Sequence, residues 1–185
     1  MWDRIKDQAK SLQQQQSQRS GSSAGQGHSA GHGSSGSGKS KAQMVGMLKS
    51  QLDSLKTELK SGAYRDASMA VCALVAAADG HVDPAERQNV ESLILSNNVL
   101  QNFPAEQLRT RFNKHVDVLM ADFARGKAEA LQEVAKAAKK PAEARAVVQT
   151  GIVVAGADGY IQPAEEQMLR EVCAALGLSP AEFGI

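Results

Sequence analysis

The sequence has little net charge, and this restricts the partners that it can attract. Its 185 residues include 21 lysines and arginines against 20 aspartates and glutamates, for a net charge of +1. Such a balance gives no general attraction to nucleic acid or to acidic membranes. No stripe of basic residues with interleaved aromatic residues occurs, and there is no zinc-finger spacing. We therefore expect no nucleic-acid partner.

Cysteines and long apolar stretches are also scarce. The two cysteines, Cys72 and Cys173, lie far apart, each inside an apolar helical stretch. Isolated thiols of this kind are typical of a reducing compartment. The longest apolar stretches, residues 69–78 and 151–157, are too short to span a bilayer, and the N-terminus lacks a signal-peptide pattern. We expect a cytoplasmic protein without a transmembrane segment.

Catalytic signatures are missing as well. The sequence contains no Ser/His/Asp set, no phosphate-binding loop and no dinucleotide-binding fingerprint. Its cysteines form no Cys-x-x-Cys motif, and they have no basic neighbour that would lower the pKa of a thiol. We interpret the protein as non-enzymatic and expect no catalytic residues.

Prolines are few, but their positions are informative. All five stand in the tripeptide Pro-Ala-Glu, and a proline followed two positions later by a glutamate is typical of the start of a helix. No segment alternates convincingly with the period of a strand. The pattern predicts an all-α protein without a sheet. The expected helices span residues 41–59, 64–78, 84–96, 104–124, 127–138, 141–157 and 163–176, with a short last turn at Pro180.

One stretch of the chain occurs twice, and it organises the rest. Residues 78–86 and 157–165 share the pattern Ala-Asp-Gly, three variable positions, then Pro-Ala-Glu, and the offset from Asp79 to Asp158 is 79 residues. Each copy follows an apolar helical stretch and precedes an amphipathic one. We call them the first and the second hinge. A repeat of this length predicts two related helical halves, whose apolar helices we expect to pack together at the centre.

The hinges have a mechanical interpretation. Gly80 and Gly159 can adopt the left-handed conformation that ends helices. Asp83 is a good N-cap, and Glu86 stands three residues later, where it completes a capping box. Gln162, the counterpart of Asp83, is a poorer cap.

The hinges also have a chemical interpretation. The spacing of Asp79 and Glu86 matches the second half of an EF-hand calcium loop, but the first half has no side-chain oxygens. The carboxylates could still hold a hard divalent cation weakly, or a basic partner surface. Both interpretations stay open at this stage. The candidate metal ligands for Ca²⁺, Mg²⁺ or Zn²⁺ are Asp79, Asp83, Glu86, Asp158 and Glu165.

The composition divides the chain into four parts. Residues 1–18 can form a short amphipathic helix, and residues 19–40 form a Gln/Gly/Ser-rich linker that cannot bury enough apolar surface to order itself. Residues 41–60 carry a Met/Leu stripe at helical spacing, which we expect to dock on the main domain. That domain is expected to span residues 61–185.

Several motifs resemble the TerB family of tellurite resistance proteins. The first hinge follows Ala-Val-Cys-Ala at residues 70–73, and Phe-Asn-Lys occurs at residues 112–114. The most specific likeness lies after the second hinge, in Arg-Glu-Val-Cys at 170–173, Ala-Leu-Gly at 175–177 and Pro-Ala-Glu-Phe-Gly at 180–184. The resemblance extends from about residue 63 to the C-terminus. The linker and Gln162, which stands where the family often has an acid, depart from the pattern.

The resemblance implies an all-α domain of two related halves in a bacterial cytoplasmic protein without known enzymatic activity. It implies a role in resistance to tellurite and related stresses, beside a TerC-like integral membrane protein and calcium-binding TerD-type proteins. A peripheral position at the inner membrane would follow. The acidic hinge residues of the family correspond here to Asp79, Asp83, Glu86, Asp158 and Glu165.

The sequence is compatible with three functional hypotheses. The first is a non-enzymatic scaffold whose acidic hinges bind divalent cations or a basic partner. The second is a metal-independent protein-interaction module at the inner membrane. The third is thiol-based reduction of tellurite by Cys72 and Cys173, which the lack of any thiol-activating neighbour opposes.

Overall fold

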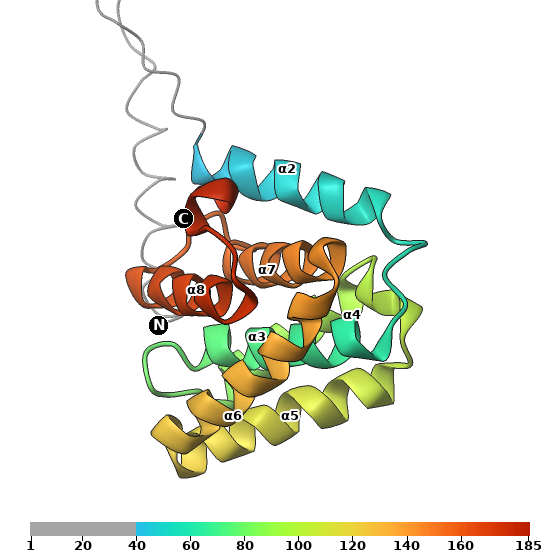
Figure 1. Ribbon diagram of the computed structural model, residues 1–185. Coiled ribbons are helices and arrows are strands. Elements are labelled where there is room, and N and C mark those ends of the chain that lie inside the picture. Colours follow the sequence, from blue (N-terminus) through green and yellow to red (C-terminus); the bar gives the residue numbers. More distant parts are fainter. Residues whose placement is uncertain (1–39) are drawn as a thin grey trace, which may run out of the picture. The chain divides into compact units, whose positions relative to one another are not determined.

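The computed structural model describes residues 40–185 (Figure 1). The predicted N-terminal helix at 1–18 and nearly all of the predicted linker at 19–40 lie outside the described residues. Within residues 40–185 the chain is helical and contains no strand, as the sequence predicts. Seven α-helices follow one another: α2 (Lys41–Ser54), α3 (Gly62–Ala76), α4 (Pro84–Ser96), α5 (Ala105–Ala121), α6 (Phe123–Ala135), α7 (Pro141–Ala155) and α8 (Pro163–Leu176). Three short 3₁₀ segments complete this part: η1 (Leu100–Asn102), η2 (Lys136–Lys139) and η3 (Pro180–Phe183).

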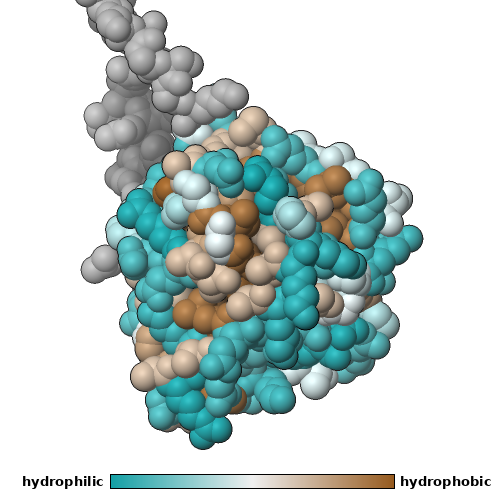
Figure 2. Space-filling view, in the orientation of Figure 1, coloured by the Kyte–Doolittle hydropathy of each residue, from teal (hydrophilic) through white to brown (hydrophobic). Residues whose placement is uncertain are grey.

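The two apolar helices α3 and α7 form the centre of the fold (Figure 1). Nearly every side chain of α3 from Ala67 to Val75 is buried, and α7 is buried almost as completely. Helices α5 and α6 cover α3, while α2 lies on α7 and α8 contacts both central helices. Outside this core, the face seen in Figure 2 is mostly hydrophilic, with apolar groups near its middle.

Small residues let α3 and α7 approach closely. A Cβ atom added to Gly151 would lie 2.4 Å from Cγ1 of Val71 and 2.9 Å from Cδ2 of Leu169. One buried hydrogen bond joins the same two helices, because the Tyr64 hydroxyl lies 2.8 Å from Oγ1 of Thr150. Since the Thr150 hydroxyl donates to the carbonyl of Ala146, Tyr64 is the donor to Thr150. The expectation that the two apolar helices pack at the centre is confirmed.

Helix α2 docks on α7 through part of its Met/Leu stripe. Leu48 and Leu52 are buried, and Met44 is partly buried, whereas Met47 is 42% exposed. The helix begins with a capping box, in which Ser40 accepts a hydrogen bond from the backbone N–H of Gln43.

The prolines mark the helix starts as predicted, but several boundaries differ. Helix α2 ends at Ser54 rather than at residue 59. Helices α3 and α7 end at Ala76 and Ala155, two residues before the expected ends, because the last turn before each glycine is already irregular. Helix α6 begins at Phe123 rather than at residue 127. Its N-cap is Asp122, whose carboxylate accepts a hydrogen bond from the backbone N–H of Arg125.

We expect Gly151→Ala to destabilise the protein. The added methyl group would collide with Val71 and Leu169, and overpacking of this kind costs about 1–3 kcal/mol. Alanine gains roughly 1 kcal/mol over glycine inside a helix, so the net loss should be up to about 2 kcal/mol. Urea unfolding measures it.

Gly46→Ala is the matched control, because a Cβ atom at this position in α2 meets nothing within 4 Å. It should stabilise the protein by about 0.5–1 kcal/mol. Equal stabilisation by both variants would show that close packing is not the reason for Gly151.

Candidate functional site: the paired acidic hinges

The first hinge is a tight turn between α3 and α4. Gly80 has a positive φ of 88°, and its N–H donates to the carbonyl of Ala77 at 2.8 Å. Asp79 closes the turn, because its carboxylate accepts from the backbone N–H of His81 at 3.1 Å. Val82 is buried and holds the turn to the core.

The start of α4 forms the capping box that the sequence predicts. The Asp83 carboxylate accepts from the N–H of Glu86 at 2.8 Å. In return, the Glu86 carboxylate accepts from the N–H of Asp83 at 3.1 Å. Asp83 and Glu86 therefore cap the start of α4, while Glu86 keeps a second carboxylate oxygen for other contacts.

The second hinge, between α7 and α8, repeats this geometry. Gly159 also has a φ of 88°, and Asp158 accepts from the N–H of Tyr160 at 3.0 Å. The N–H of Gln162 donates to Glu165 at 2.8 Å. Ile161 is buried in the position that corresponds to Val82. The repeat in the sequence is thus a repeat in three dimensions.

The fold brings the negative charges of the two hinges close enough to act on one another. The pKa of Glu165 is raised from 4.5 to about 7, mainly by burial. The hydrogen bond from Gln162 acts in the opposite direction, and the negative charges of Asp158, Asp79 and Glu86 raise the pKa further. Two of these three carboxylates belong to the other hinge. Proximity of the hinges is a tertiary property that the sequence does not reveal.

Cations within the described chain do not neutralise this group. None of the ion pairs among residues 40–185 involves Asp79, Asp83, Glu86, Asp158 or Glu165. In the same part of the chain, no three His, Cys, Asp or Glu side chains converge closely enough to hold a metal ion. The carboxylates lie near enough to repel one another, but they do not form a ready coordination shell. Cation binding by these five residues stays a prediction.

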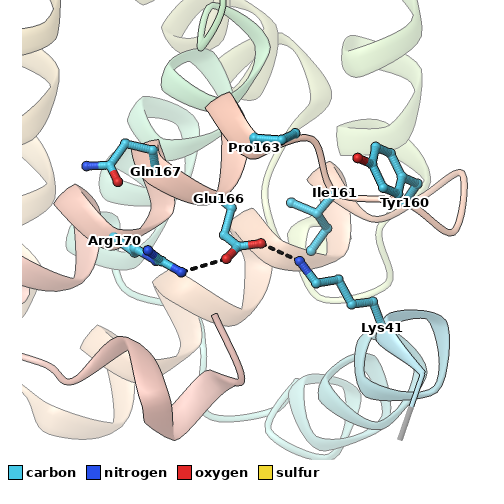
Figure 3. A pocket seen from close by; sticks show the side chains of 7 residues that line it. All are labelled: Lys41, Tyr160, Ile161, Pro163, Glu166, Gln167 and Arg170. Carbon is cyan, nitrogen blue, oxygen red and sulfur yellow. Dashed lines mark hydrogen bonds and ion pairs between the residues drawn. The ribbon is translucent and has the colours of Figure 1, made fainter. Parts of the chain in front are cut away.

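The second hinge has a shallow pocket of about 340 Å³ on its outer side (Figure 3). Glu166 lies in it between two cations: it accepts from Lys41 at the start of α2 and from Arg170 at 2.7 Å. Tyr160 stands at the edge and is 59% exposed. Sequence reasoning missed this arrangement, although the four-residue spacing of Glu166 and Arg170 is a readable signal.

The two hinges differ at the position that Glu166 occupies. Arg87 is its counterpart in the first hinge, 79 residues earlier, and Arg87 donates to Asp117 of α5 at 2.7 Å. One hinge therefore carries a cation on its first helical turn where the other carries an anion. The exposed residues after the glycines differ as well, with His81 in the first hinge and Tyr160 in the second.

The cysteines lie in the core, away from any activating group. Both side chains are fully buried. Burial raises the pKa of the Cys72 thiol to about 12 and that of the Cys173 thiol to about 11. Because the thiolate is the reactive form, this environment suppresses thiol chemistry.

The fold and the site together define a class: an all-α domain of two related halves, each with an Asp-Gly turn between a buried and an amphipathic helix. A family model described as tellurite resistance protein TerB matches residues 65–185. The match covers more than half of the chain, and the chain belongs to the TerB family. The resemblance seen in its motifs is thereby confirmed. Searches among curated proteins and among solved structures give no significant match.

The raised pKa of Glu165 predicts a pH dependence of stability. The folded chain binds a proton at Glu165 that the unfolded chain releases between about pH 4.5 and 7. The stability that goes with the protonated carboxyl is fully present below pH 4.5 and is lost as the pH rises through 7. Since Glu165 is partly exposed, we expect a loss of about 1–2 kcal/mol.

Urea unfolding at pH 5 and pH 8 tests this. Glu165→Gln should keep the hydrogen bond from Gln162 and remove this part of the pH dependence. Glu58→Gln, at an exposed position before α3, should leave the dependence unchanged. An identical pH profile for wild type and Glu165→Gln would contradict the assignment.

The buried thiols give a second prediction. A disulfide reagent at pH 7 should modify Cys173 about 100-fold and Cys72 about 1,000-fold more slowly in the native chain than in the denatured chain, because the thiolate fraction falls about tenfold for each unit by which the pKa is raised. The absorbance of the thiolate that the reagent releases measures the rates in the native and in the denatured chain. Equal rates would mean that the thiols are accessible and reactive in the native fold.

Proposed function

We propose that this TerB-family chain is a non-enzymatic scaffold in tellurite resistance, and that its paired hinges bind a cationic partner surface. The observation that supports this is the mutual repulsion of carboxylates from both hinges, which contributes to the raised pKa of Glu165. A partner that brings positive charge would relieve this repulsion. The repulsion raises the free energy of the unbound protein, and its relief in the complex favours binding.

The spread of the carboxylates favours a surface of lysine and arginine side chains over one dehydrated ion. A metal ion needs several oxygens at about 2–2.6 Å, and no group of three ligand side chains meets that condition among residues 40–185. Long basic side chains can reach separate carboxylates individually. The exposed ring of Tyr160 in the second hinge adds a face on which a cation can stack.

A membrane protein is a suitable source of such a surface. Cytoplasmic loops of integral membrane proteins carry an excess of lysine and arginine. No helix within residues 40–185 is long and apolar enough to cross a membrane. We propose a TerC-like protein at the inner membrane as the partner, with this chain as a cytoplasmic, peripheral component.

A divalent cation is the second candidate ligand of the hinges. Glu86 and Glu165 each use one carboxylate oxygen for capping, which leaves the other oxygen for a hydrated Ca²⁺ or Mg²⁺. Calcium-binding TerD-type partners would fit such a cation-dependent scaffold. Thiol-based reduction of tellurite is the least supported alternative, because both thiols are buried and carry raised pKa values.

Calorimetric titration of the full chain separates these candidates. The titrants are a lysine- and arginine-rich peptide, Ca²⁺, Mg²⁺ and Zn²⁺, at low and at physiological salt. The hinge variants are Asp79→Asn, Glu86→Gln, Asp158→Asn and Glu165→Gln, which keep most of the capping ability and remove the charge. Glu106→Gln and Glu129→Gln remove the same charge from α5 and α6 as matched controls.

We expect the peptide to bind wild type and the two controls alike, and to bind each hinge variant more weakly. The affinity for the peptide should fall with added salt, because salt screens the exposed charges. Saturable binding of a divalent ion that the hinge variants abolish would support the second candidate. Equal peptide binding by wild type and all hinge variants would refute the role of the hinges.

A further inference from the structure

A second polar pocket lies on a different part of the domain. It has a volume of about 350 Å³ and is lined by residues of α3, α5 and α6, the three helices in the lower part of Figure 1. Six residues line it: Asp66, Thr110, Arg111, Lys114, His115 and Glu133. Asp66 stands ten residues before the end of α3, roughly 15 Å along the helix from the first hinge. The pocket therefore does not belong to the hinge site.

The two carboxylates of the pocket are already neutralised by the protein. Asp66 accepts from Nε of Arg65 at 2.8 Å and from Nε of Arg111 at 2.6 Å. Burial raises the pKa of Asp66, but these hydrogen bonds and the charges of both arginines outweigh burial and leave the pKa lowered. Glu133 accepts from Nζ of Lys136 at 2.7 Å. Neither carboxylate needs a further cation.

Several hydrogen-bond donors of the pocket, in contrast, are unused. Within residues 40–185, the Thr110 hydroxyl, the Lys114 ammonium and the His115 imidazole form no hydrogen bond or ion pair with another residue. Arg111 uses Nε for Asp66 and Nη1 for the carbonyl of Gln107, which leaves Nη2 without a partner in the same part of the chain. All four donors come from α5, on side chains that line one concavity.

The charges of the lining balance, with Arg111 and Lys114 against Asp66 and Glu133. Both carboxylates, however, are held by ion pairs, since Arg65 and Arg111 bind Asp66 and Lys136 binds Glu133. The ammonium of Lys114 and Nη2 of Arg111 therefore remain for another acceptor. Unused donors on two cationic side chains and one hydroxyl in a single hollow are the chemistry that recognises a small oxyanion.

We propose that this pocket is a binding site for a small inorganic oxyanion of the phosphate or sulfate type. Nη2 of Arg111 and Nζ of Lys114 supply charge-assisted donors, and the Thr110 hydroxyl supplies a neutral one. The His115 imidazole lies beside the bound anion and donates one N–H. No bond is made or broken, and the site is independent of the hinges and of their proposed partner.

The pKa of the His115 imidazole offers a way to measure binding at this pocket. Burial is the largest influence and lowers the pKa of His115, while Glu133, Asp66 and Glu129 raise it and Lys114 lowers it. These groups face the imidazole from α3, α5 and α6, and the net effect is a lowered pKa of His115. A bound anion adds a negative charge at close range, and this must raise the pKa of His115.

The test is a titration of the full chain with inorganic phosphate, sulfate and tellurite separately, followed by the ring proton signals of His115 in NMR spectra. We expect saturable shifts and a higher pKa of His115 in the presence of the bound anion. By linkage, the affinity should rise as the pH falls through that pKa. The ranking of the three anions identifies the geometry that the pocket prefers.

Lys114→Ala removes the central unused cation and should weaken binding about tenfold or more. Thr110→Val tests the hydroxyl at nearly constant shape. Lys60→Ala removes the same charge from an exposed position outside the pocket and should leave the affinity unchanged. The far-UV spectrum and urea midpoint of each variant confirm that the fold is intact.

Two results would overturn the proposal. One is the absence of saturable His115 shifts for all three anions in wild type. The other is equal weakening by Lys114→Ala and Lys60→Ala, which would indicate only general attraction to positive charge. Loss of hinge binding in the peptide titration would not affect the outcome here, so the two proposals fail separately.

Discussion

The close contact between α3 and α7 is the constraint on which the rest of the structure depends. Gly151 provides room for Val71 and Leu169, so the two helices approach at a distance that larger residues would prevent. Once they touch, their remaining faces are buried by α2, α5, α6 and α8. The buried bond between Tyr64 and Thr150 fixes how the helices are aligned.

The hinges gain their chemical character from this central pair. Each is, by itself, a turn with an Asp side chain that closes it and a glutamate that caps the next helix. When the halves pack together, carboxylates of both hinges repel one another, and this repulsion contributes to the raised pKa of Glu165. Helix capping and cation attraction are therefore not competing explanations. The caps fix the carboxylates in place, and fixed like charges cannot move apart to avoid repulsion.

Local features of this fold could be predicted from the sequence because their causes are local. Pro-Ala-Glu begins a helix wherever it stands, and the glycines at 80 and 159 need a positive φ in any turn of this type. The start of α6 lies four residues before the predicted one, because nothing in the sequence distinguishes the N-cap Asp122 from other acidic residues. Gly126 explains the tight turn before α6, since a Cβ atom there would lie 2.7 Å from the backbone of Leu119.

The contacts that bring separate parts of the chain together at the candidate sites are not local, and no sequence pattern predicts them. Glu166 and Lys41 are separated by 125 positions, and the field between the hinges depends on how two halves pack. The pocket of Lys114 and His115 exists only because α5 and α6 cross on α3. The sequence shows which side chains carry donors, whereas tertiary contacts decide which of those donors remain unused.

The exchange of Arg87 for Glu166 gives the duplicated fold a direction. Two identical halves would present a face that looks the same after half a turn, and a ligand could lie across it either way round. Here one end carries a guanidinium held by Asp117, and the other carries a carboxylate held between Lys41 and Arg170. An elongated molecule spanning both ends would meet a balanced ion pair at one tip and one surplus positive charge at the other. Its two orientations would then differ in energy, so a domain built by repetition can still distinguish the two ends of a bound molecule.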